Sequence, residues 1–122
     1  MEIWINPACS KCRTAVATLD EAGTTYTQRR YLDEPPTVAE LEELLGRLGL
    51  EPWDVARTGD AAAKEAGLRA LAKDAASRGA WIETLVAHPR LIQRPIITLD
   101  DGTAVIARDP ETLARVVEQA GG

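Results

Sequence analysis

The sequence predicts an α/β fold, a mixed β-sheet built in the order β-α-β and then β-β-α, with a helical segment inserted between the two parts. Three observations predict this order. A strand-like run is followed by a helix-like spacing near the start, helical phrases fill the middle, and two short strands joined by a turn precede a final helix. With 122 residues, we expect one domain over 1–122 that carries the helical insertion at about 37–90.

The first part of the chain predicts a strand, a helix and a second strand. Glu2–Ile5 has the composition of a short strand, and residues 12–22 place Cys12, Val16 and Leu19 at the i, i+4 and i+7 positions of a helix that ends at Gly23. Residues 25–32 alternate weakly, which indicates a partly exposed strand. A crossover of this length favours parallel strands with a right-handed connection.

The middle of the chain predicts helices only. Thr37 and Glu40 have the spacing of a capping box, a leucine stripe follows, and Gly49 ends the pattern. Residues 52–77 are rich in alanine and hold short helical phrases interrupted at Gly59 and Gly67. The phrase "AWIETLVAHP" predicts one more short amphipathic helix.

The last part predicts a hairpin and a final helix. "RPIITL" and "TAVIA" have the composition of strands, and "DDG" between them is typical of a tight turn. Asp109 as N-cap and Pro110 as the first helical residue then begin the helix. This is the element order of a thioredoxin-like sheet, in which a proline, usually cis, faces the active-site cysteine; Arg94-Pro95 is placed to supply that bond.

Composition excludes several classes of protein. Hydrophobic residues make up 45% and charged residues 27% of the chain, close to the average for a globular domain. The net charge of -5 argues against broad nucleic-acid binding. No apolar run approaches the roughly 20 residues of a membrane helix, and the start does not have the pattern of a signal peptide, so we expect a cytoplasmic protein without membrane contact. Eleven of the 14 basic residues are arginines, which could still form a local anion site.

The stretch "NPACSKCR" holds both cysteines. Cys9 falls between the first strand and the first helix, where backbone N–H groups and the helix dipole favour an anion, and Lys11 and Arg13 add positive charge. We therefore expect a lowered pKa and a nucleophilic thiolate at Cys9. Cys12 lies one turn into the helix on its apolar face, so it should be the more buried of the two.

Three interpretations of this pair stay open. A strand–CxxC–helix context favours a redox pair in which Cys9 attacks and Cys12 resolves, with Arg13 as a residue that tunes the thiol. Alternatively, Cys12 is a small apolar core residue with no redox part. A zinc site is disfavoured, because one CxxC and the distant His88 supply at most three of about four ligands, so we expect no metal.

Four stretches together resemble a known family. "NPACSKCR", "YLDEPPTVAELEELLGRLG", "LIQRPIIT" and "ARDPETL" are similar, in this order, to segments of the glutaredoxin-coupled arsenate reductase family, which also includes the Spx-type transcriptional regulators. The resemblance runs from Ile3 to about Val117.

The resemblance implies an activity and a site. The residue that matches Cys9 attacks arsenate in the family's reductases, glutathione releases arsenite from the thiol adduct, and glutaredoxin clears the mixed disulfide. Three arginines hold the oxyanion in that scheme, and they match Arg57, Arg94 and Arg108. Planar arginine side chains and a helix N-terminus suit this task, since both offset the repulsion between a thiolate and an anion. No bound cofactor is implied, only a low-molecular-weight thiol as co-substrate.

Two departures keep alternatives open. Many reductases of the family carry a histidine shortly before the nucleophile, where this chain has Trp4-Ile5-Asn6. They usually have no thiol at the position of Cys12, whereas Spx-type regulators have a CxxC followed by arginine and use it as a disulfide switch. Two alternative functions therefore remain beside arsenate reduction. One is a regulator that binds RNA polymerase, and the other is a glutathione-dependent thiol reductase. Thioredoxin is the alternative to glutaredoxin as the regenerating protein.

Overall fold

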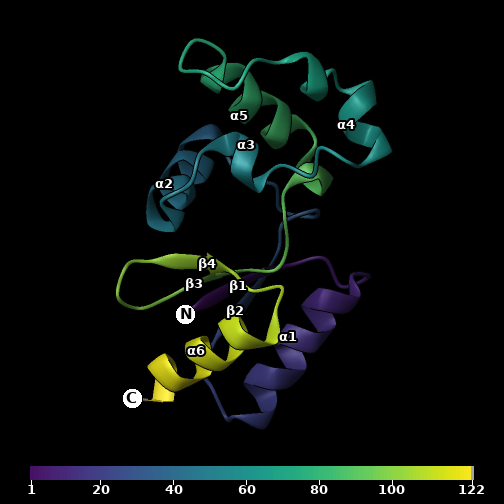
Figure 1. The fold of residues 1–122 in the computed structure, drawn as a ribbon. Helices are drawn as coiled ribbons and strands as arrows, with labels where there is room; N and C mark the ends of the chain where they lie inside the picture. The colour runs from purple at the N-terminus through teal and green to yellow at the C-terminus, as the bar shows by residue number, and fades with distance from the viewer. Residues whose placement is uncertain (122) are drawn as a thin grey trace. The chain divides into compact units, whose positions relative to one another are not determined.

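Four short strands form the predicted mixed sheet (Figure 1). The computed structural model describes residues 1–121. The strand order is β2-β1-β3-β4; β1 pairs parallel with β2 and antiparallel with β3, which pairs antiparallel with β4. The strands are β1 (Glu2–Ile5), β2 (Thr27–Arg30), β3 (Ile96–Thr98) and β4 (Ala104–Ile106). The β1–β2 pair is parallel, as predicted.

Two helices cover one face of this sheet (Figure 1). They are α1 (Ser10–Glu21), which connects β1 to β2, and α6 (Pro110–Gly121), which follows β4. Alternate residues of the strands face these helices, as the two-residue period of a strand requires. The core between the sheet and the helices contains Ile3, Ile5, Cys12, Ala15, Leu19, Ile97, Leu99, Ala107, Leu113 and Val116.

The element boundaries differ slightly from the predicted ones. The helix predicted over 12–22 begins two residues earlier, at Ser10, directly after its N-cap Cys9. The strand predicted over 25–32 is shorter because the chain turns after Arg30, whose carbonyl oxygen accepts hydrogen bonds from the N–H groups of Asp33 (3.0 Å) and Glu34 (2.9 Å). Tyr31 therefore lies outside the strand, and its side chain is fully buried.

Backbone contacts divide the chain into two compact units. The sheet unit contains residues 1–34 and the described residues from 94 onwards, and the helical unit is Pro35–Gln93. The single domain expected over 1–122, with its insertion at about 37–90, stays a prediction. The helical unit contains α2 (Val38–Leu48), α3 (Pro52–Val55), α4 (Ala61–Glu65), α5 (Arg78–Ala87) and the short 3₁₀ helices η1 (Leu68–Ala70) and η2 (Pro89–Leu91).

Helix α2 has the ends that the sequence predicts. The Thr37 hydroxyl accepts the N–H of Glu40 (3.1 Å), and the Glu40 carboxylate accepts the N–H of Thr37 (3.1 Å), so both halves of the capping box are present. Gly49 follows the helix with a left-handed φ of 68°, a conformation that glycine adopts without strain.

Helix α5 organises the helical unit. It packs against α2 and α3. Its Trp81 is buried, contacts Trp53 edge to face at a centroid distance of 6.1 Å, and donates from Nε1 to the carbonyl oxygen of Ala72 (2.9 Å). The indole is thus buried with its polar atom satisfied.

The β3–β4 hairpin begins at a cis peptide bond between Arg94 and Pro95. The Pro95 carbonyl oxygen accepts the N–H of Ala107 (2.9 Å), which closes the open end of the hairpin. The cis bond expected at Arg94-Pro95 is therefore present, at the start of the third strand. Within residues 1–121, no helix combines the length and hydropathy needed to cross a lipid bilayer.

Candidate active site around Cys9 and Cys12

Cys9 lies at the corner between β1 and α1. It is the N-cap residue of α1, with φ -86° and ψ 126°, and its side chain is half-buried. Its carbonyl oxygen accepts the N–H of Arg13 (3.1 Å) as the first helical hydrogen bond. The thiol is therefore next to the N–H groups of the first helical turn, which have no partner within the helix.

Asn6 shapes the loop that carries the cysteines. Its side-chain Oδ1 accepts the N–H of Ala8 (3.0 Å), and its carbonyl oxygen accepts the N–H of Cys9 (2.9 Å). Its own N–H points at Sγ of Cys12 (3.5 Å). The bond from Oδ1 to the N–H two residues on is an Asx turn, and the backbone N–H of the same residue contacts the sulfur of Cys12.

The surroundings of Cys9 favour its thiolate. Burial alone would raise the pKa of this thiol, but the backbone N–H of Cys12, the Arg94 side chain and the N–H of Lys11 lower the pKa from 9.0 to about 7. The side chain of Cys12 acts in the same direction. Near neutral pH a large fraction of Cys9 is therefore nucleophilic thiolate.

Cys12 is in the opposite state. Its side chain is 1% exposed, and burial together with the nearby Cys9 raises the pKa of the Cys12 thiol to about 11. At neutral pH it is a protonated thiol in contact with Cys9. The structure agrees with the expectation that Cys12 is the more buried of the pair, and both cysteines are free thiols.

Arg94, 85 residues after Cys9 in the sequence, places a positive charge beside Cys9. It immediately precedes the cis bond to Pro95, is half-buried, and its guanidinium interacts with both Cys9 and Tyr31. Burial works against the charged form, yet the interaction with Cys9 raises the pKa of Arg94. Arg94 is thus a charged partner of the Cys9 thiolate.

Arg108 lies at the other end of the hairpin. It follows β4, is half-buried, and its Nη1 donates to the carbonyl oxygen of Arg94 at 2.7 Å. The next residue, Asp109, accepts the N–H of Thr112 (3.0 Å) and so forms the predicted cap of α6. Hairpin and cap together position the side chain of Arg108 beside Arg94.

Arg57 belongs to the other compact unit, and Arg13 follows Cys12 in α1. Arg57 is half-buried in the helical unit, where its N–H donates to the carbonyl oxygen of Leu91 (2.7 Å), and its part in an oxyanion site stays a prediction. Arg13 is exposed on the first turn of α1. Tyr31 was absent from the predicted site, and only its place in the "YLDEPP" segment could have pointed to it.

Metal ligands do not gather within residues 1–121, because no three His, Cys, Asp or Glu side chains come together there in a way that could hold an ion. What the corner offers is an ionisable thiol, a second thiol in contact with it and guanidinium groups. This set suits thiol chemistry on an anion.

Fold and site together define a class of protein. A CxxC corner between β1 and α1, in contact with the residue before a cis-proline, on a four-stranded mixed sheet makes this a thioredoxin-like protein with a candidate thiol site. The ArsC family model matches residues 4–116, and the chain belongs to the ArsC family.

Known proteins of similar sequence and structure match nearly the whole chain. An uncharacterized protein in the glnII region of Streptomyces viridochromogenes is 59% identical over 113 residues, covering 93% of this chain and 95% of that protein. An arsenate reductase of Neisseria meningitidis serogroup A is 35% identical, covering 96% and 97%. The structure of an arsenate reductase from Vibrio cholerae superposes with a TM-score of 0.83 at 33% identity, covering 95% of this chain and 98% of the other.

Proposed function

We propose that this protein reduces arsenate to arsenite, with Cys9 as the nucleophile and glutathione or another small thiol as co-substrate. One observation carries the proposal: a thiol with a pKa of about 7 contacts the guanidinium of Arg94, and Arg108 is held beside Arg94. Relatives named arsenate reductase support the choice of substrate.

The first step forms a bond between sulfur and arsenic. The Cys9 thiolate attacks the arsenic of arsenate, and one arsenate oxygen leaves as water after it has been protonated. Nucleophile and substrate are both anionic, so their repulsion opposes the attack. Arg94 and Arg108, and in this proposal Arg57, offset the repulsion by charge-assisted hydrogen bonds. Pro95 shapes the backbone beside the thiol, and Arg13 adds positive charge next to the pair.

The second step reduces arsenic. A second thiol attacks the sulfur of Cys9, a disulfide forms, and the electron pair of the sulfur–arsenic bond passes to arsenic, which leaves as arsenite. If Cys12 is the second thiol, it loses its proton and a Cys9–Cys12 disulfide remains, which thioredoxin could reduce. If glutathione is the second thiol, a mixed disulfide remains for glutaredoxin. The contact between Cys12 and Cys9 makes Cys12 a possible second thiol beside glutathione.

A second candidate function follows from the same contact. A pair of adjacent thiols, one ionised and one protonated, also suits a disulfide switch in an Spx-type regulator that binds RNA polymerase. A third, narrower alternative is a glutathione-dependent thiol reductase with another substrate. All three place the protein in the cytoplasm, where thiols stay reduced.

The deciding experiment is an arsenate-dependent assay on the wild type, Cys9→Ser and Cys12→Ser. Each protein is supplied with glutathione and glutaredoxin or, separately, with thioredoxin. We expect arsenite from the wild type and none from Cys9→Ser. Steady-state arsenite production by Cys9→Ser would exclude this mechanism. Absence of activity with both reductants, together with capture of RNA polymerase by the oxidised protein, would favour the regulator.

A further inference from the structure

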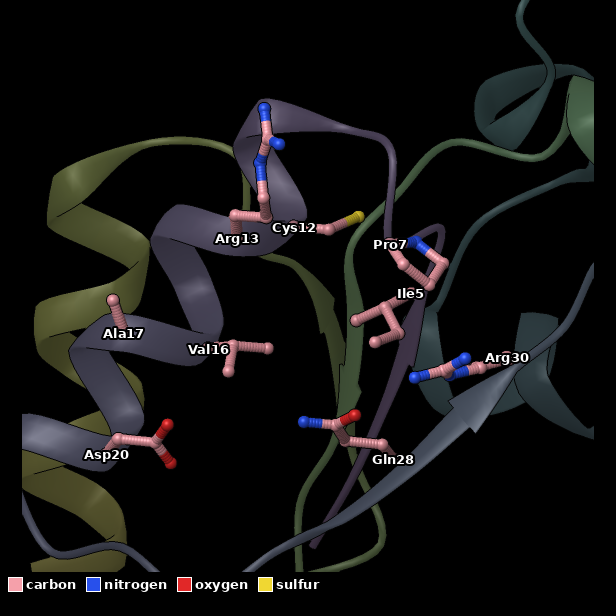
Figure 2. Close-up of a pocket in the computed structure, with 9 residues that line it drawn as sticks. All are labelled: Ile5, Pro7, Cys12, Arg13, Val16, Ala17, Asp20, Gln28 and Arg30. Atoms are coloured by element: carbon pink, nitrogen blue, oxygen red, sulfur yellow. The ribbon is translucent and has the colours of Figure 1, made fainter.

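The side-chain charge that acts on the Cys9 thiol comes from Arg94. Arg13 follows Cys12 directly, but its guanidinium points away from the pocket that Cys12 lines between α1 and β2 (Figure 2). Lys11 acts on Cys9 through its backbone N–H, whereas Arg94 acts through its side chain. The state of the Cys9 thiol therefore depends on where the guanidinium of Arg94 is held.

The guanidinium of Arg94 interacts with Cys9 and with the hydroxyl of Tyr31, which belongs to the same compact unit. A guanidinium can only donate, so the hydroxyl oxygen of Tyr31 is the acceptor. The backbone of Arg94 is fixed separately, because Arg108 donates to its carbonyl oxygen (2.7 Å). Tyr31 thus contacts the part of Arg94 that this backbone bond leaves able to rotate.

Tyr31 is itself held in place by its ring and by its backbone. Its side chain is fully buried, and its ring stacks on that of Trp4 at a centroid distance of 6.2 Å with 28° between the planes. The carbonyl oxygen of the preceding residue, Arg30, accepts two backbone N–H groups in the turn after β2. A closely packed ring has little freedom to move, so the Tyr31 hydroxyl has one position.

Trp4 is fixed by contacts of its own. It lies in β1 directly across from Arg29 in β2, so both side chains are on one face of the sheet. Cζ of Arg29 lies 4.6 Å from the centroid of the Trp4 ring, and Nε1 of Trp4 donates to the Glu2 carboxylate (2.8 Å). Arg29 also donates to the carbonyl oxygen of Glu34 from Nε (3.2 Å) and Nη2 (3.1 Å). Stacked side chains therefore connect the edge strand to the ring of Tyr31.

We propose that Tyr31 is a positioning residue, whose hydroxyl holds the guanidinium of Arg94 against the sulfur of Cys9. The inference deepens the proposed function and rests on it for the part that Arg94 plays toward arsenate. Without the hydroxyl, the guanidinium would rotate more freely and stabilise the Cys9 thiolate less. If Tyr31 instead competed with Cys9 for the guanidinium, loss of the hydroxyl would stabilise the thiolate more. The two cases differ in sign, so one measurement separates them.

Tyr31→Phe removes the hydroxyl and keeps the stacked ring. The midpoint of the pH dependence of Cys9 alkylation, measured without arsenate, should rise by about 0.5, so that the rate well below the midpoint falls about threefold. In an Arg94→Ala background, the same substitution should leave the midpoint where Arg94→Ala alone places it. Tyr26→Phe is the matched control, because the Tyr26 hydroxyl donates to Asp20 (2.6 Å), and it should behave like the wild type.

An unchanged or lower midpoint in Tyr31→Phe would overturn the proposal, and so would an equal rise with and without Arg94. A measurement on the wild type does not depend on how the variants fold. NMR of the reduced, arginine-labelled protein should show a nuclear Overhauser contact between the Nη protons of Arg94 and the ring protons of Tyr31. Absence of this contact, with both sets of signals resolved, would also overturn the proposal.

The proposed function is tested by a separate measurement, arsenite production by the wild type. If the wild type makes no arsenite but Tyr31→Phe raises the midpoint only in the presence of Arg94, the positioning role is supported and arsenate reduction is contradicted. Arsenite production without any rise of the midpoint in Tyr31→Phe would overturn the positioning role alone.

Discussion

The Nη1 atom of Arg108 donates a hydrogen bond of 2.7 Å to the backbone carbonyl oxygen of Arg94, 14 residues earlier in the chain. The two arginines flank the β3–β4 hairpin: Arg94 precedes β3 and Arg108 follows β4. Arg94 interacts with Cys9 directly, so the hydrogen bond connects Arg108 to the same corner through the backbone of Arg94.

Arg94→Ala should lower kcat/KM for arsenate by a factor on the order of 10²–10³, the usual effect of removing one preorganised charge donor. The measurement is steady-state arsenite production. Arg115→Ala, an exposed arginine on α6 of the same unit, is the control and should match the wild type. A loss below threefold in Arg94→Ala, with an unchanged melting temperature, would contradict the oxyanion role.

Alkylation of Cys9 should depend on pH with a midpoint near 7, because its thiolate reacts and its pKa is lowered to about 7. The rate should fall about tenfold per pH unit well below the midpoint and level off above pH 8 or so. Arg94→Ala should move the midpoint upward, since the guanidinium favours the thiolate. Peptide mass spectrometry after iodoacetamide treatment separates Cys9 from Cys12; a wild-type midpoint near 9 would refute the prediction.

Cys12→Ser should stop turnover with thioredoxin but still allow one attack of Cys9 on arsenate, because the variant lacks the second thiol of the intramolecular disulfide. Intact-protein mass spectrometry detects the single Cys9–arsenic adduct, and arsenite release is expected from the variant only when glutathione supplies the second thiol. Turnover of the variant with thioredoxin alone, at the rate of the wild type, would show that Cys12 has no resolving part.

Asn6→Ala should lower the free energy of unfolding by about 0.5–1.5 kcal/mol, the net contribution of one hydrogen bond, because the N–H of Ala8 loses its side-chain acceptor. Asn6→Ser retains a weaker acceptor and should recover part of the loss. Guanidinium unfolding at fixed pH compares the three proteins, and equal midpoints would argue against the Asx turn.

Thr37→Ala should destabilise the protein by about 0.5–2 kcal/mol, since it removes the hydroxyl that accepts the N–H of Glu40 in the capping box of α2. Thr25→Ala, at an exposed position outside any helix, serves as the comparison and should change little. Equal stability of the two variants would mean that the α2 cap contributes nothing measurable.

Local signals made much of the fold predictable. The capping box at Thr37, the Asp109 cap and the "DDG" turn each specify a boundary within a few residues, so their positions agree with the structure. The end of β2 was placed too late because the turn after Arg30 depends on backbone hydrogen bonds that no residue type announces.

The part of the site that lies in one short segment, the cysteine loop, was predictable from the sequence. The contacts between distant segments were less so. The helix N-terminus together with Lys11 and Arg13 predicted a reactive Cys9, and the apolar face of the same helix predicted a buried Cys12. The contact of Arg94 with Cys9 and Tyr31 arises only when strands from both ends of the chain are paired. The spacing of residues along the sequence does not give the distance between side chains that come together only in the folded protein.

The unequal acidities of the two thiols have a consequence for electron flow. Near pH 7 the dithiol form gains stability from ionisation of Cys9, while Cys12 stays protonated and contributes no such gain. A stabilised dithiol makes the corresponding disulfide a stronger oxidant, and the lower-pKa sulfur is also the faster leaving group. Any disulfide formed here should therefore have a less negative reduction potential than an ordinary structural one and be readily reopened by cellular thiols.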